Sequence, residues 1–194
     1  MTDENQLIRE ISSGKESAFR ELYDRYASKV YNTAISYVQN DMDAEEVVQD
    51  VFHTLYKSAS KFKFNSSVST WIYRITVNKS LDFIRKKNAS RRKGVFLSLY
   101  KKDSAEIRYD QSDFVHPGVA MENQEDAAFL FAAINELKEN QKTAFILTQI
   151  EDISQQEAAE IMGITRKAVE SLVQRAKANL RKNLENLFPG RGKS

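Results

Sequence analysis

The segment spanning residues 154–174 constrains the fold most, because its residue spacing specifies two helices joined by a sharp turn. Ser154 is followed three residues later by Glu157, which is the spacing of a capping box at the start of a helix. Gly163 ends that helix, since glycine adopts the left-handed conformation of a helix exit at little cost. Thr165 is placed to cap a second helix. The spacing predicts a helix-turn-helix, and two ordinary packed helices of a bundle are the alternative.

The second of these helices is expected to have one apolar and one polar side. The apolar side repeats at helical spacing as Ala168 or Val169, Leu172 and Ala176. The second helix of a helix-turn-helix lies in the major groove of DNA. The candidates for contact with duplex DNA are all polar or charged, and five of them are basic. They are Thr165, Arg166, Lys167, Glu170, Ser171, Gln174, Arg175, Lys177 and Arg181.

Positive charge is concentrated in two runs, although the net charge of the chain is only +2. One run extends from Arg85 to Lys93, and the other, from Arg175 to Lys182, follows the helix-turn-helix. Acidic residues gather between the two runs, at 103–126, and also at 41–50. Two basic patches separated by an acidic segment indicate two contacts with DNA.

Several functional classes are disfavoured by what the sequence lacks. It has no cysteine, which excludes thiolate metal sites, and His53 and His116 lack the spacing of metal ligands. There is no glycine-rich phosphate loop and no nucleophile with an evident base. No apolar run approaches the ~20 residues of a membrane span, and the polar start is unlike a signal peptide. We expect a cytoplasmic protein that is not an enzyme and has no metal, cofactor or small-molecule substrate.

Apolar residues recur at helical spacing nearly throughout, which predicts an all-α chain. One long helix is expected over about 16–38. Another is expected to begin at Asp43, with Asp43 and Glu46 forming a capping box. A polar loop at 61–69 then precedes a third helix over about 70–87.

The region 97–125 shows no sustained periodicity and contains the helix breaker Pro117-Gly118. These features are typical of a flexible linker. We therefore expect two helical domains, at 1–96 and 126–194, each burying a core of its own. The second is expected to be a four-helix unit that contains the helix-turn-helix.

The third helix carries a stripe of residues that can hold nucleic acid. Steps of three or four residues place Trp71, Arg74, Asn78, Asp82 and Arg85 on one side. An aromatic ring stacks any base, and neighbouring basic groups hold the backbone, so single-stranded or flipped bases suit this stripe. The alternative is that Trp71 anchors the core and Asp82 pairs with Arg85 on the surface.

The chain has the stripe motif in its first half and the helix-turn-helix in its second half. Together, the two halves resemble the sigma factors of bacterial RNA polymerase, specifically the short two-domain extracytoplasmic-function (ECF) group. D-A-E-E-V-V-Q-D-V-F at 43–52 resembles the family's core-polymerase-binding helix. T-W-I-Y-R-I-T-V-N-K-S-L-D-F-I-R at 70–85 resembles its T-W-L-x-x-I-x-x-N-x-x-x-D-x-x-R pattern. T-R-K-A-V-E-S-L-V-Q-R-A-K-A-N-L-R at 165–181 resembles its T-V-x-S-R-L-x-R-A-x-x-x-L-R pattern for the minus-thirty-five element.

The resemblance implies a transcription initiation factor with defined partners: core RNA polymerase, promoter DNA as duplex and as melted nontemplate strand, and an anti-sigma factor, usually membrane-anchored. The residues implied for polymerase binding are Asp43, Glu45, Glu46, Gln49 and Asp50. Those implied for promoter melting and for the minus-ten element are Lys61, Asn65, Ser66, Trp71, Arg74, Asn78, Asp82, Arg85 and Lys86. By the same similarity, the loop at 61–69 receives a flipped base.

The second domain departs from the family pattern at two positions. Glu170 stands where many members carry a basic residue, and Leu172 where many have arginine. A carboxylate can accept a hydrogen bond from the N4 amine of cytosine, so the recognised promoter is expected to differ from those of better-known members. The alternative function is a stand-alone helix-turn-helix regulator, although no strand pattern indicates the receiver or ligand domain that such a regulator needs.

Overall fold

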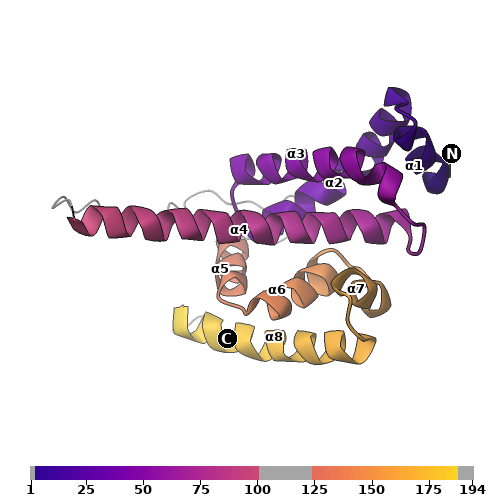
Figure 1. Ribbon diagram of the computed structural model, residues 1–194. Coiled ribbons are helices and arrows are strands. Elements are labelled where there is room, and N and C mark those ends of the chain that lie inside the picture. Colours follow the sequence, from indigo (N-terminus) through magenta and orange to yellow (C-terminus); the bar gives the residue numbers. More distant parts are fainter. Residues whose placement is uncertain (1–2, 101–123, 188–194) are drawn as a thin grey trace.

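The computed structural model describes residues 3–100 and 124–187, which are helical with short connections (Figure 1). These residues form α-helices, one short 3₁₀ helix and one π-helical segment, and they contain no strand. The predicted all-α class is confirmed.

Residues 3–100 form four α-helices and the 3₁₀ helix. These elements are α1 (Glu4–Ser12), α2 (Glu16–Val38), α3 (Asp41–Ser58), η1 (Ala59–Lys61) and α4 (Val68–Tyr100). Residues 124–187 form four α-helices and the π-helical segment. These elements are α5 (Gln124–Asn135), α6 (Glu139–Phe145), η2 (Ile146–Ile150), α7 (Gln155–Met162) and α8 (Arg166–Leu187). The long helix over 16–38 and the four helices of the second domain are as predicted.

A first apolar core forms where α2, α3 and α4 pack together and α1 packs on α2. The helix α1 was not predicted. Its signal was nevertheless present, because Leu7, Ile8 and Ile11 share one helical face and are all buried. Asp3 caps this helix by accepting a hydrogen bond from the backbone N–H of Asn5 at 3.4 Å.

The starts of α3 and α4 differ from the prediction. The cap of α3 is Asn40, whose side chain accepts a hydrogen bond from the N–H of Asp43 at 3.0 Å. Asp43 therefore lies inside the first turn and is not the cap. Ser67 accepts a hydrogen bond from the N–H of Thr70 at 3.0 Å, so α4 begins within the predicted loop. It also runs past its predicted end near 87, as far as Tyr100.

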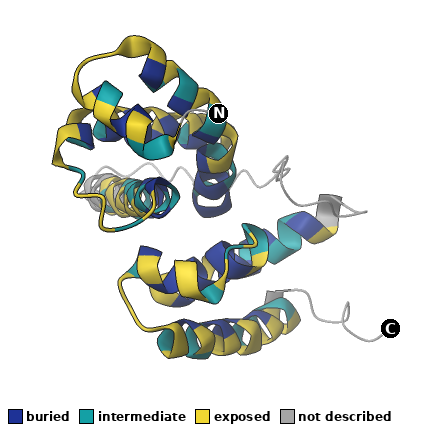
Figure 2. Cartoon of the chain, turned by 90° about the vertical axis from the view of Figure 1, so that its right-hand side faces the viewer, coloured by how far each residue is buried: buried dark blue, intermediate teal, exposed yellow. Residues whose placement is uncertain are grey.

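Each half has an apolar core, as expected, but the second core also takes in residues of the first domain. Tyr37 of α2 and Val77 of α4 are buried in the same cluster as Phe131, Ile134 and the other apolar residues of the second domain. In Figure 1, α4 lies between the helices of the first domain and α5 to α8. Most of the helices have one buried and one exposed side (Figure 2), whereas α6 is buried on all sides over residues 141–145. The helix α4 contributes buried residues to both cores.

Candidate nucleic-acid interface

The helix-turn-helix has the local geometry that the sequence predicts. Ser154 and Glu157 form both halves of the capping box at the start of α7. Gly163 follows that helix in the left-handed conformation, with φ 66°. Thr165 Oγ1 accepts a hydrogen bond from the N–H of Ala168 at 3.2 Å, which caps α8. The turn is therefore fixed by the left-handed backbone of Gly163 at the end of α7 and by the Thr165 side chain at the start of α8.

The helix α8 presents its predicted polar residues on an exposed side. The buried side consists of Val169, Val173, Ala176 and Leu180 rather than the predicted Leu172, which is only half-buried. The exposed members of the predicted set are Thr165, Arg166, Lys167, Glu170, Gln174, Arg175, Lys177 and Arg181. This side is mostly basic and lies on the outside of the molecule, where a DNA groove can reach it.

Ser171 is the one member of this set that is not fully exposed. It is half-buried, and its hydroxyl accepts a hydrogen bond from the Arg175 guanidinium at 2.7 Å. The same guanidinium also donates to the Ser171 carbonyl oxygen at 3.2 Å. Ser171 therefore orients Arg175, so that these two residues act together on the surface.

The stripe on α4 divides between the first core and the second domain. Trp71 is half-buried against the first core and stacks on Phe62, with ring centroids 4.5 Å apart. One face of the indole is thus covered, which leaves less of the ring for a base. Arg74 donates to two backbone carbonyls of α7, and Arg85 pairs with both Asp82 and Glu139.

Every member of the proposed minus-ten set on α4 except Trp71 is exposed, although Arg74, Asp82 and Arg85 are engaged in the contacts above. Asn78 and Lys86 are both exposed, and Lys86 lines a hollow of about 370 Å³ between α3 and α4. Asp43 and Glu46 line this hollow from the α3 side. The basic turn of α4 and the acidic side of α3 therefore face each other across the hollow.

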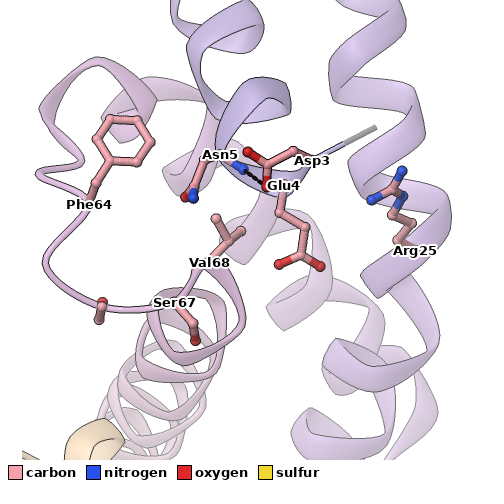
Figure 3. A pocket seen from close by; sticks show the side chains of 8 residues that line it. Asp3, Glu4, Asn5, Arg25, Phe64, Ser67 and Val68 are labelled. Atoms are coloured by element: carbon pink, nitrogen blue, oxygen red, sulfur yellow. Dashed lines mark hydrogen bonds between the residues drawn. The ribbon is translucent and has the colours of Figure 1, made fainter. Parts of the chain in front are cut away.

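The predicted loop at 61–69 borders another hollow, of about 380 Å³ (Figure 3). Ser66 is part of its lining, whereas Lys61 and Asn65 are exposed and lie outside the lining. Its full lining is Asp3, Glu4, Asn5, Arg25, Phe64, Ser66, Ser67 and Val68. The contributions of α1 and of Arg25 on α2 were not predicted, because they depend on packing between distant segments.

Phe64 is held in an unusual position beside this hollow. Its φ is 56°, in the left-handed region that costs a residue with a side chain about 1 kcal/mol. Phe64 is 40% exposed as a residue, and its ring packs against Phe62 with its centroid 5.0 Å from the Arg9 guanidinium. An exposed aromatic ring in a strained loop is typical of a ligand contact.

The acidic side of α3 is exposed, apart from Asp43. Glu45, Glu46, Gln49 and Asp50 all face solvent, as predicted for a partner-binding helix. Asp43 is half-buried and forms an ion pair with Lys87 of α4. Among the described residues, no cluster of three His, Cys, Asp or Glu side chains could hold a metal ion. His53 is exposed on α3, and His116 lies outside the described residues.

Two ionisable side chains that no sequence pattern indicates lie between the domains, Lys142 buried and Glu151 half-buried. Burial lowers the pKa of Lys142 to about 8. Burial also raises the pKa of Glu151 to about 7, while Thr33 and Lys29 act in the opposite direction. Neither residue belongs to a sequence motif, so only the packing of the two halves reveals them.

Membrane-spanning helices are not found in the part of the chain that the structure covers, since none of its helices is both long and apolar enough.

Two protein families match the chain, one in each half. Residues 22–90 match the family described as Sigma-70 region 2, and residues 130–180 match Sigma-70 region 4. The first match spans most of α2 to α4, and the second ends within α8.

Two relatives align with the chain over nearly its whole length. The ECF RNA polymerase sigma factor SigW of Bacillus subtilis is 29% identical, and the alignment covers 93% of this chain and 96% of SigW. The ECF RNA polymerase sigma-E factor of Haemophilus influenzae is also 29% identical, with 97% of this chain and 98% of the relative aligned.

Two solved structures share the fold. CnrH, solved in complex with the cytosolic domain of CnrY, has a TM-score of 0.66 at 24% identity, covering 94% of this chain and 97% of CnrH. The sigma factor RpoE of Bartonella quintana, solved with the anti-sigma factor NepR, has a TM-score of 0.57 at 24% identity, covering 86% and 96%. With region 2 and region 4 matched in order and ECF relatives along the whole chain, the protein belongs to the two-domain ECF sigma factors of bacterial RNA polymerase.

Proposed function

We propose that this sigma factor directs transcription from a promoter whose minus-thirty-five element is read by α8. The single observation that carries this proposal is the exposed, mostly basic side of α8 on a helix-turn-helix that is capped at both ends of its turn. Glu170, Ser171 and Gln174 are assigned to base reading, and Arg175 is oriented beside them by Ser171. Arg166, Lys177 and Arg181 are assigned to the phosphates, because guanidinium and ammonium groups supply the sequence-independent part of binding.

The first domain is assigned to the minus-ten element and to the melted nontemplate strand. Asn78 and Lys86 are exposed on α4, next to the other residues of the stripe. The hollow beside the loop at 61–69 is lined by hydrogen-bonding side chains and by the exposed ring of Phe64 (Figure 3). A flipped base needs both stacking and polar contacts, and this hollow provides both.

The acidic side of α3 is assigned to core RNA polymerase. Glu45, Glu46, Gln49 and Asp50 are exposed on a helix whose opposite side is buried in the first core. Their charge is therefore available to a basic partner without loss of internal packing. The structural relative RpoE was solved with an anti-sigma factor, and we infer a regulator of this kind for the present chain as well. Because polymerase and promoter are the partners, we infer action in the cytoplasm.

Transcription by purified core polymerase tests the function as a whole. Core polymerase with this protein should initiate at a specific promoter, whereas core polymerase alone should not. A protein that binds DNA but never directs initiation would instead be a stand-alone regulator, and that result would overturn the proposal.

Charge reversal on α3 tests the polymerase contact. Asp50→Lys should abolish copurification with core polymerase, because an ammonium replaces an exposed carboxylate at the proposed contact. Asp24→Lys, which reverses an exposed carboxylate on α2, is the matched control. Equal copurification of the two variants would remove this side of α3 from the interface.

A further inference from the structure

The two domains cap each other's helices. The last turn of α2 has no basic residue of its own, and Lys142 from α6 donates to the carbonyl of Tyr37 there at 3.0 Å. The last turn of α7 also lacks a basic residue, and Arg74 from α4 donates to the carbonyl of Glu160 at 2.6 Å. Helix C-termini carry partial negative charge and unpaired carbonyls, so each cation satisfies a helix of the opposite domain.

Two further polar contacts and an apolar seam hold the domains together. Arg85 of α4 forms an ion pair with Glu139, the first residue of α6, at 2.5 Å. The side-chain amide of Gln39 donates to the carbonyl of Phe131 at 2.8 Å. Between these contacts, Tyr37 is buried in the core of the second domain. The docked arrangement is therefore specific, since four polar contacts fix its register.

Both arginines of the α4 stripe are used in this docking. A guanidinium that donates to a helix terminus or to a carboxylate cannot hold a DNA phosphate with the same N–H groups. The end of α7 also lies against α4 at Arg74, where a strand following the stripe has to pass. The second domain and a melted DNA strand therefore compete for one surface.

We propose that the α4 stripe binds either the second domain or single-stranded DNA, so that the docked form is a self-inhibited state of this sigma factor. The inference rests on the proposed role of the stripe in reading the minus-ten element. It assigns the second domain a further role, as an internal inhibitor that withdraws Arg74 and Arg85 until the domains separate.

A distance measurement between the domains tests whether docking persists in solution. The chain has no cysteine, so labels can be attached uniquely at Ser28→Cys on α2 and Glu185→Cys on α8, both exposed and outside the proposed sites. Double electron–electron resonance between spin labels at these two positions should give one narrow distance distribution for the otherwise unchanged protein. A broad distribution, unaltered by the opening variant described next, would overturn the proposal.

The opening variant combines Gln39→Gly with Glu139→Gln. Gln39 has φ 52°, so glycine removes its amide without straining the end of α2. Glu139→Gln removes the carboxylate that holds Arg85 and leaves the side-chain shape almost unchanged. Glu136→Gln is the matched control, because Glu136 is exposed and makes no hydrogen bond or ion pair in the described structure.

The opening variant should show a longer and broader distance and should bind short single-stranded DNA of random sequence about tenfold more tightly, a factor that corresponds to about 1.4 kcal/mol. Adding Arg85→Ala should remove most of this gain. If the domains of the opening variant separate but its affinity for single-stranded DNA does not increase, the proposed self-inhibition is wrong. Loss of promoter-directed transcription with core polymerase in every variant would count against the proposed function, whereas the distance and DNA-binding results would still decide the inference.

Discussion

The buried ammonium of Lys142 makes the stability of this protein depend on pH in a defined window. Lys142 is 6% exposed, and it donates to the carbonyl of Tyr37 and to Asn135 Oδ1. These acceptors favour the charged form, but burial is the larger effect and lowers the pKa from 10.5 to about 8. The folded protein therefore binds this proton less tightly than the unfolded chain does. Above pH 10.5 the uncharged Lys142 does not reduce the stability of the fold. As the pH falls from 10.5 to about 8, the free energy of unfolding decreases, and below about 8 the full cost of burying the charge is present.

The size of the effect follows from these two pKa values. A change of one pH unit corresponds to 1.36 kcal/mol, so charging Lys142 in the folded state costs roughly 3 kcal/mol. About 2 kcal/mol of this cost disappears between pH 7 and pH 9.5, because the folded state loses its proton in that range while the unfolded chain keeps most of its own. Lys142→Met fills similar space without a titrating group and should lack this dependence.

Urea unfolding of wild type and Lys142→Met at several pH values between about 7 and 9.5 measures the effect. The free energy of unfolding of wild type should rise by about 2 kcal/mol relative to that of the variant across this range. Lys138→Met removes an exposed ammonium four residues earlier and controls for the change in net charge. A difference between wild type and Lys142→Met that stays constant with pH would refute the reasoning.

Three further substitutions test the helix-turn-helix. Gly163→Ala should lower the free energy of unfolding by about 1–2 kcal/mol through backbone conformation alone, because φ is 66° and no atom lies within 4 Å of an added Cβ; urea unfolding measures this. Ser154→Ala should cost about 1 kcal/mol by the same assay, since it removes the capping box of α7. Glu170→Ala should relax the preference at one base pair by about 1–3 kcal/mol and strengthen nonspecific binding, and identical sequence logos from binding-site selection would show that Glu170 only faces solvent.

The helix-turn-helix could be predicted from sequence because its determinants are local. The capping box at Ser154 and the left-handed Gly163 depend on residues within one turn of each other. The same local reasoning placed the cap of α3 at Asp43, where Asn40 in fact takes that role. Asparagine and aspartate are both favourable at the N-cap position. Asn40 takes this role because it directly precedes the first helical residue, whereas Asp43 lies within the first turn.

The contacts between the domains could not be predicted, because they join residues far apart in the chain. Arg74 and Glu160 are 86 positions apart, and Lys142 and Tyr37 are 105 apart. Periodicity marks Tyr37 as a residue of the first domain, and nothing in its neighbourhood indicates that the second domain buries it. The stripe on α4 was identified correctly as one side of the helix, but its occupation by α7 follows only from the fold.

The seam between the domains contains polar groups that weaken it near neutral pH. Burial raises the pKa of Glu151 to about 7, so the stability that its protonated form contributes is present below pH 4.5 and is lost as the pH rises through about 7. One of its carboxylate oxygens is buried without a hydrogen-bond partner among the described residues, which disfavours the charged form further. Lys142 has the opposite dependence and is charged below about pH 8. Near neutral pH, Lys142 is therefore charged and Glu151 is about half charged, each at a cost. This cost reduces the free energy that a competing DNA strand has to supply to separate the domains.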